Sequence, residues 1–87
     1  MDIHHLVKMA NDIGDFFGSE PDQDKGAKGI ADHIRSFWDP RMRRQILAYI
    51  DSTSGEGLSE LVLTALRTYR NNLAPHGESG PGHPVPN

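Results

Sequence analysis

The chain has 87 residues, which is enough for one domain and too few for two. It contains no cysteine, so disulfide bonds, thiolate nucleophiles, cysteine-bound zinc and iron–sulfur ligation by this chain are excluded. Its formal net charge of -3 argues against nucleic acid as a partner, because phosphate contacts need a concentrated basic surface.

The first predicted element is a helix over residues 2–17. Its apolar side chains recur at spacings of three and four residues, as on one buried face of a helix: Ile3, Leu6, Ala10, Ile13 and Phe17, with Val7, Met9 and Phe16 widening this face. We expect Gly18 to end this helix in the left-handed conformation that glycine tolerates. Gly14 either weakens the helix, by roughly 1 kcal/mol relative to alanine, or allows close packing against a neighbour.

A second helix is predicted over residues 23–38, after a turn at residues 19–22 that contains Pro21. Either Asp22 or Asp24 supplies the side-chain oxygen that caps the free backbone N–H groups at its start. Its apolar side chains again fall on one face of the helix: Ala27, Ile30, Ala31, Ile34, Phe37 and Trp38.

The pair Asp39-Pro40 predicts a sharp corner after the second helix. Proline disfavours helical geometry at the residue before it, and it fits well at the first position of a helix that aspartate caps. We therefore predict a third helix over residues 40–51, with one apolar face formed by Met42, Ile46, Leu47 and Ile50.

The last predicted helix covers residues 59–72, after a loop at residues 52–57 that is rich in serine and glycine. Residues 74–87 hold four prolines and three glycines, and Val85 is their one apolar side chain larger than alanine. Such a segment buries too little surface to offset its ordering entropy, so we expect a disordered tail. The predicted fold is all-α, with a bundle of about four short helices at residues 1–73 and the tail at residues 74–87.

The sequence predicts a cytoplasmic protein without membrane contact. No apolar run approaches the roughly 20 residues that span a bilayer. The first 17 residues carry charges throughout, beginning with Asp2, and they lack the cleavage site of a secretory signal.

No motif in the sequence predicts a catalytic, metal-binding or cofactor-binding site. His4 and His5 are adjacent, and neighbouring helical residues point about 100° apart, so they converge poorly on one ion. A composite metal site with His33, His76 and His83 is the weaker alternative. Nucleophile elbows and glycine-rich phosphate loops are absent. We therefore assign this chain no catalytic residue, no metal ligand and no cofactor.

The corner between the second and third helices is the best candidate for a contact with another protein. It gathers side chains of the kinds that dominate binding energy at interfaces: Phe37, Trp38, Pro40, Arg41, Met42, Arg43 and Arg44. Three arginines near a helix start oppose the helix macrodipole unless acidic groups compensate, which favours a partner. The alternative is that Phe37 and Trp38 lie in the core and the arginines lie in solvent.

Two longer strings of residues are distinctive: LVKMANDI at residues 6–13, followed by FF at residues 16–17, and IADHIRSFWDPRMR at residues 30–43. Both resemble the delta subunit of soluble, multisubunit NAD-dependent formate dehydrogenases. The resemblance covers most of residues 1–73, and the string FWDPRMR is fairly specific for a chain this short.

This resemblance implies a non-catalytic accessory subunit. In that family the alpha subunit oxidises formate with molybdenum on a bis-MGD cofactor and with iron–sulfur clusters. Beta and gamma subunits carry FMN and clusters and deliver electrons to NAD. The chain is then expected to bind and stabilise the alpha subunit and to support its assembly, with beta and gamma as further members of the complex. The alternative is a transient chaperone for molybdenum cofactor insertion that leaves the mature complex.

Overall fold

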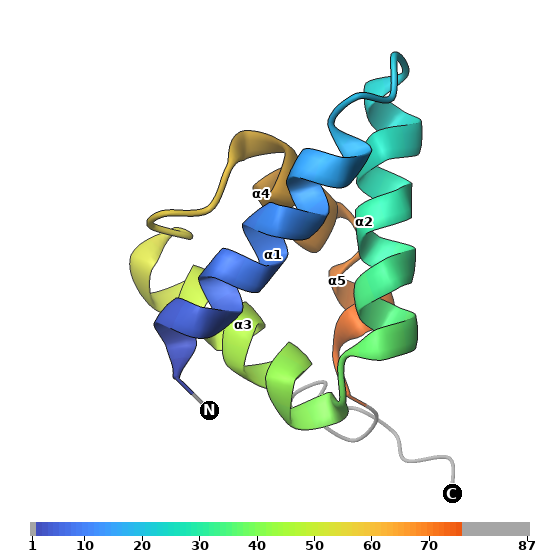
Figure 1. Ribbon diagram of the computed structural model, residues 1–87. Helices are drawn as coiled ribbons and strands as arrows, with labels where there is room; N and C mark the ends of the chain where they lie inside the picture. Colours follow the sequence, from blue (N-terminus) through green and yellow to red (C-terminus); the bar gives the residue numbers. More distant parts are fainter. Residues whose placement is uncertain (1, 76–87) are drawn as a thin grey trace, which may run out of the picture.

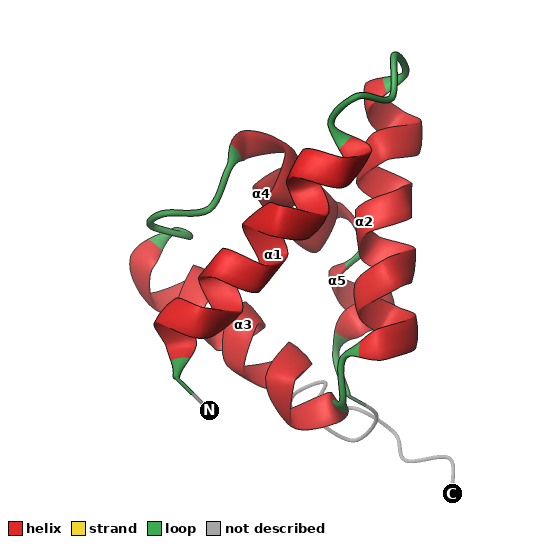
Figure 2. Ribbon diagram, viewed as in Figure 1, coloured by secondary structure: helices red, strands yellow, loops and turns green. Residues whose placement is uncertain are grey.

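The computed structural model describes residues 2–75, and every regular element in this range is a helix (Figure 2). The elements are α1 (Ile3–Phe17), α2 (Gln23–Phe37), α3 (Pro40–Thr53), α4 (Glu60–Thr68) and the short α5 (Arg70–Leu73). α1 and α2 form the framework, since both pack against α4, while α1 also contacts α3 and α2 also contacts α5 (Figure 1). The all-α prediction is confirmed for the described residues.

The core lies where the helices meet, and it is built from the predicted apolar faces. Its largest fully buried side chains come from every helix: Leu6, Ile30, Ile34, Ile46, Val62, Leu66 and Leu73. Trp38 belongs to the same cluster, although it stands just past the end of α2. The spacing of three and four residues therefore located most of the buried side chains, although Phe37, which it placed on the apolar face of the second helix, is exposed.

Polar side chains fix where the helices begin. The backbone N–H of Asp24 donates to the carboxylate of Asp22 over 2.9 Å, so Asp22 and not Asp24 caps α2. At the corner, the N–H of Met42 donates to Asp39 over 3.0 Å, and Pro40 opens α3 as predicted. Each such cap contributes about 1 kcal/mol to stability.

Two predicted details at helix ends were wrong. α1 ends at Phe17 as predicted, but Gly18 has φ -68° and ψ -16°, which is right-handed and not left-handed. α3 continues past Asp51 to Thr53, because the Thr53 hydroxyl donates to Tyr49 O over 2.8 Å and accepts the N–H groups of Gly55 and Glu56. Threonine is common in loops, but here the hydroxyl of Thr53 forms hydrogen bonds with backbone groups at the end of α3.

The predicted helix at residues 59–72 is interrupted at Tyr69, which has φ -105° and ψ 22°. The break coincides with contacts that hold α5 against the bundle. The Arg70 guanidinium pairs with both carboxylate oxygens of Asp51, at 3.0 and 2.7 Å, and Leu73 is buried. Ala74 and Pro75 follow, and Pro75 is buried. The rest of the predicted tail lies outside the described residues.

The loop between α3 and α4 is tied to α1 by one amide. Asn11 Nδ2 donates to Gly57 O over 2.9 Å, while Asn11 Oδ1 accepts the N–H of Ser59 over 3.0 Å. Gly57 has φ +89°, a conformation that glycine adopts without strain. α1 thereby sets where α4 begins.

The crossing of α1 and α4 depends on the missing side chain of Gly14. A Cβ atom there would lie 2.6 Å from Val62 Cγ2, and Val62 is fully buried and stiff at χ1. Of the two interpretations that the sequence left open, the structure supports close packing.

Trp38→Ala should destabilise the isolated chain by about 3–5 kcal/mol, because the side chain is only 4% exposed. Phe37→Ala is the matched control, since the neighbouring ring is 74% exposed and its loss should change stability by no more than about 0.5 kcal/mol. Urea denaturation of both variants measures the difference. Equal destabilisation by the two substitutions would contradict the burial of Trp38 and the exposure of Phe37.

Gly14→Ala should destabilise the chain by about 1–2 kcal/mol, although alanine is the better helix former, because the new methyl group overpacks against Val62. The same substitution in a Val62→Ala background should cost much less. A double-mutant cycle followed by thermal melting measures this coupling. A stabilising effect in the wild-type background would show that α4 has room to move.

Candidate functional site: a partner interface

The seven residues predicted as an interface do not share one surface. Trp38 is 4% exposed and Arg43 is 8% exposed, so the structure places both inside. Phe37 is 74% exposed. Pro40, Arg41 and Arg44 are also exposed, and Met42 is half-buried. Trp38 and Arg43 are therefore not available as surface anchors in this arrangement, and an interface role for the other five stays a prediction.

The electrostatic argument for a partner at this corner is weaker than the sequence suggested. Asp39 places a carboxylate at the start of α3, where it accepts the N–H of Met42. A negative charge at this position offsets the positive end of the helix dipole. Arg43 Nη1 donates to Leu73 O over 3.3 Å, so this arginine also has a role inside the fold. The helix dipole at this corner thus does not by itself require an acidic group from a partner.

Aromatic rings form a continuous row from α1 to α2. The Phe16 and Phe17 centroids are 5.0 Å apart, those of Phe17 and His33 are 6.5 Å apart, and those of His33 and Phe37 are 4.7 Å apart. Phe16 and Phe37, at its two ends, are 75% and 74% exposed. These four residues are called the aromatic row below.

The aromatic row lines a groove between α1 and α2. One hollow of about 530 Å³ lies against the row together with Asp12 and Ile13. A second hollow of about 340 Å³ shares Ile13, His33 and Phe37 with it and continues to Met42 at the corner. We call the two together the α1–α2 groove. Two large exposed rings at one groove make it the candidate surface for an interaction.

Sequence reasoning found one end of this groove and missed the other. Phe37 was predicted as an interface residue, whereas Phe16 was assigned to the buried face of the first helix. A signal was present, because Phe16-Phe17 and Phe37-Trp38 are adjacent aromatic pairs. Neighbouring residues on a helix point about 100° apart, so an adjacent pair of large rings is a place where one ring can lie at the edge of the buried face.

No group of three or more His, Asp or Glu side chains between residues 2 and 75 is placed to hold a metal ion. His33 lies in the aromatic row, while His4 and His5 are exposed at the start of α1. His76 and His83, the other members of the composite site considered above, lie outside the described residues. In the same part of the chain, no helix combines the length and apolar character needed to cross a membrane.

The family of this chain follows from comparison with known proteins. Residues 5–66 match the family described as NADH-dependent formate dehydrogenase delta subunit FdsD. This range includes most of α1, all of α2 and α3, and most of α4, together with both distinctive strings at residues 6–13 and 30–43. Comparisons with curated proteins and with solved structures gave no match. Because the matched range is well over half of its length, the chain belongs to the NADH-dependent formate dehydrogenase delta subunit family.

Proposed function

We propose that this chain is a non-catalytic accessory subunit that binds and stabilises the molybdenum-containing alpha subunit of the complex and supports its assembly. Membership of the delta subunit family makes it a subunit of the formate dehydrogenase complex. The observation that carries the proposal is the α1–α2 groove, with Phe16 and Phe37 turned out at its ends. The alpha subunit is the partner that we assign to this groove.

The groove has the composition of the centre of a protein interface. Two exposed phenylalanines flank it, and burying each one contributes about 1.5–3 kcal/mol before the cost of association. Met42 carries the apolar surface as far as the corner, where exposed Arg41 follows Asp39 and Pro40. An apolar centre with an arginine at its edge is the common arrangement at protein interfaces.

Binding through this groove would stabilise both partners by mass action. A ligand that binds only the folded state shifts the unfolding equilibrium in proportion to its concentration relative to its dissociation constant. The proposed subunit therefore acts as a clamp on the folded alpha subunit. Formate oxidation, molybdenum on bis-MGD, iron–sulfur clusters and FMN belong in this proposal to the alpha, beta and gamma subunits, and the complex works in the cytoplasm.

Replacing both exposed rings, as Phe16→Ser with Phe37→Ser, should leave the isolated chain folded and weaken complex formation at least about tenfold. Both side chains already lie in solvent, so their loss removes no core contact. Affinity purification of the alpha subunit with tagged variants measures the effect. Thr64→Ala with Thr68→Ala, at exposed positions of α4, is the matched control. Undiminished recovery of the alpha subunit by the double phenylalanine variant would refute the assigned surface.

Removal of the whole chain should lower the molybdenum content per alpha subunit or the temperature at which the complex dissociates. Metal analysis and thermal dissociation of the complex, purified with and without this chain, test both effects. Unchanged values would contradict the clamp and the assembly role together. The purified active complex should also hold this chain in a fixed ratio to the alpha subunit, whereas its absence there would favour the transient chaperone.

A further inference from the structure

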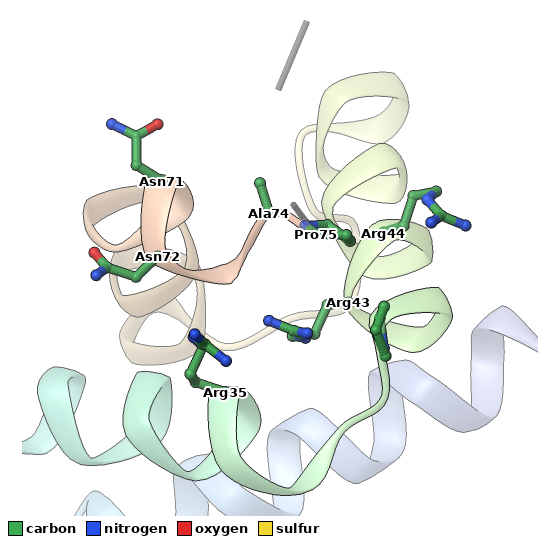
Figure 3. A pocket seen from close by; sticks show the side chains of 8 residues that line it. Arg35, Arg43, Arg44, Asn71, Asn72, Ala74 and Pro75 are labelled. Atoms are coloured by element: carbon green, nitrogen blue, oxygen red, sulfur yellow. The ribbon is translucent and has the colours of Figure 1, made fainter. Parts of the chain in front are cut away.

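A second hollow lies away from the α1–α2 groove, between the end of α2, the start of α3 and α5 (Figure 3). Its volume is about 500 Å³. Among residues 2–75, the side chains that line it include arginines and asparagines and no acidic group: Arg35, Pro40, Arg43, Arg44, Asn71, Asn72, Ala74 and Pro75. We call it the arginine pocket. Its lining offers hydrogen-bond donors and positive charge.

Arg43 is the unusual member of this lining. The residue is 8% exposed, and its Nε–H is buried without a hydrogen-bond partner. Nη1 donates to Leu73 O over 3.3 Å, which is a neutral acceptor. None of the ion pairs formed among residues 2–75 includes Arg43. A buried guanidinium with five N–H donors normally finds a carboxylate or a phosphate, because an unpaired buried charge is strongly unfavourable.

Arg35 adds a second positive charge at the same place. It stands in the last turn of α2, and Figure 3 shows its side chain and that of Arg43 reaching toward one another at one side of the pocket. Both guanidinium groups therefore add positive charge to one hollow. An oxyanion in the pocket would balance this charge and would accept from the N–H groups that line it.

We propose that the arginine pocket binds a phosphate group, held between Arg43 and Arg35. A phosphate monoester carries a charge of roughly −1.5 to −2 near pH 7, which matches two guanidinium groups better than one carboxylate does. The asparagines at residues 71 and 72 add neutral amide groups to the lining. A volume of about 500 Å³ leaves room beside the phosphate for the small molecule that carries it. The site is separate from the α1–α2 groove and is independent of the partner assigned there.

The first test is a titration of the full-length chain with inorganic phosphate and, separately, with glycerol phosphate, in a phosphate-free buffer at constant ionic strength. Nitrogen-15 NMR reports on the Nε–H group of Arg43 directly. We expect a saturable shift of this signal with either probe and a rise in melting temperature. Saturation by glycerol phosphate at a lower concentration would identify an organic phosphate as the ligand, and equal affinity would identify the free ion. The absence of a saturable shift would overturn the proposal.

Two comparisons decide whether the pocket is selective for phosphate. Succinate at the same ionic strength should leave the Arg43 signal unchanged, and an equal response to this dicarboxylate would overturn the assignment. Glu78→Gln removes the one side-chain carboxylate that follows Pro75 in the sequence. The variant should bind phosphate with unchanged affinity. If phosphate bound only after this substitution, the chain's own carboxylate would be the natural occupant and the proposal would fail.

Arg35→Gln is the variant that tests the geometry, because Arg35 is exposed and its removal should spare the fold. We expect phosphate affinity to fall at least about tenfold, since one of two charge-assisted contacts is lost. Arg41→Gln is the matched control, because it removes an exposed arginine that does not line the pocket. Equal affinity of the two variants for phosphate would show that a general positive charge, and not the arginine pocket, attracts the ion.

Discussion

The burial of Trp38 at the corner between α2 and α3 is the constraint on which the rest of the structure depends. The indole lies in the core although α2 has already ended, so the chain must turn immediately afterwards, and Asp39 and Pro40 make that turn. Because Trp38 points inward, its helical neighbour Phe37 points out and completes the aromatic row. The same turn directs α3 so that Arg43 reaches the carbonyl group of Leu73.

The surface that results has two separate chemical characters. The α1–α2 groove is apolar and ends in exposed phenylalanines, whereas the arginine pocket is cationic and holds a buried guanidinium. A domain of this size has a small core, so contacts made at its surface add a large share to its total stability. A subunit of this kind is more stable when it is bound to its partner, so its folding and the assembly of the complex are coupled. The proposed clamp function depends on this coupling.

Local patterns in the sequence predicted most of the fold. Apolar spacing located the buried face of each helix, and the Asp39-Pro40 pair located the corner. The sequence patterns failed to predict helix breaks and the burial of individual side chains where these depend on contacts between residues distant in sequence. The break at Tyr69 accompanies an ion pair between Arg70 and Asp51, 19 residues apart, and no local signal marks it. The exposure of Phe16 was missed because helical spacing alone places it beside the buried stripe. Arg43 was missed as a buried residue because arginine is rarely inside, and only the contact of its side chain with Leu73 of α5 shows it there.

The central claim is that a large partner covers the α1–α2 groove, and a structure of the purified complex at side-chain resolution tests it most directly. The quantity to measure is the exposed fraction of Phe16 and Phe37, which is 75% and 74% in the chain alone. The account predicts that both rings become buried against the alpha subunit. A complex in which both rings stay in solvent, while another face of this chain contacts the alpha subunit, would contradict it.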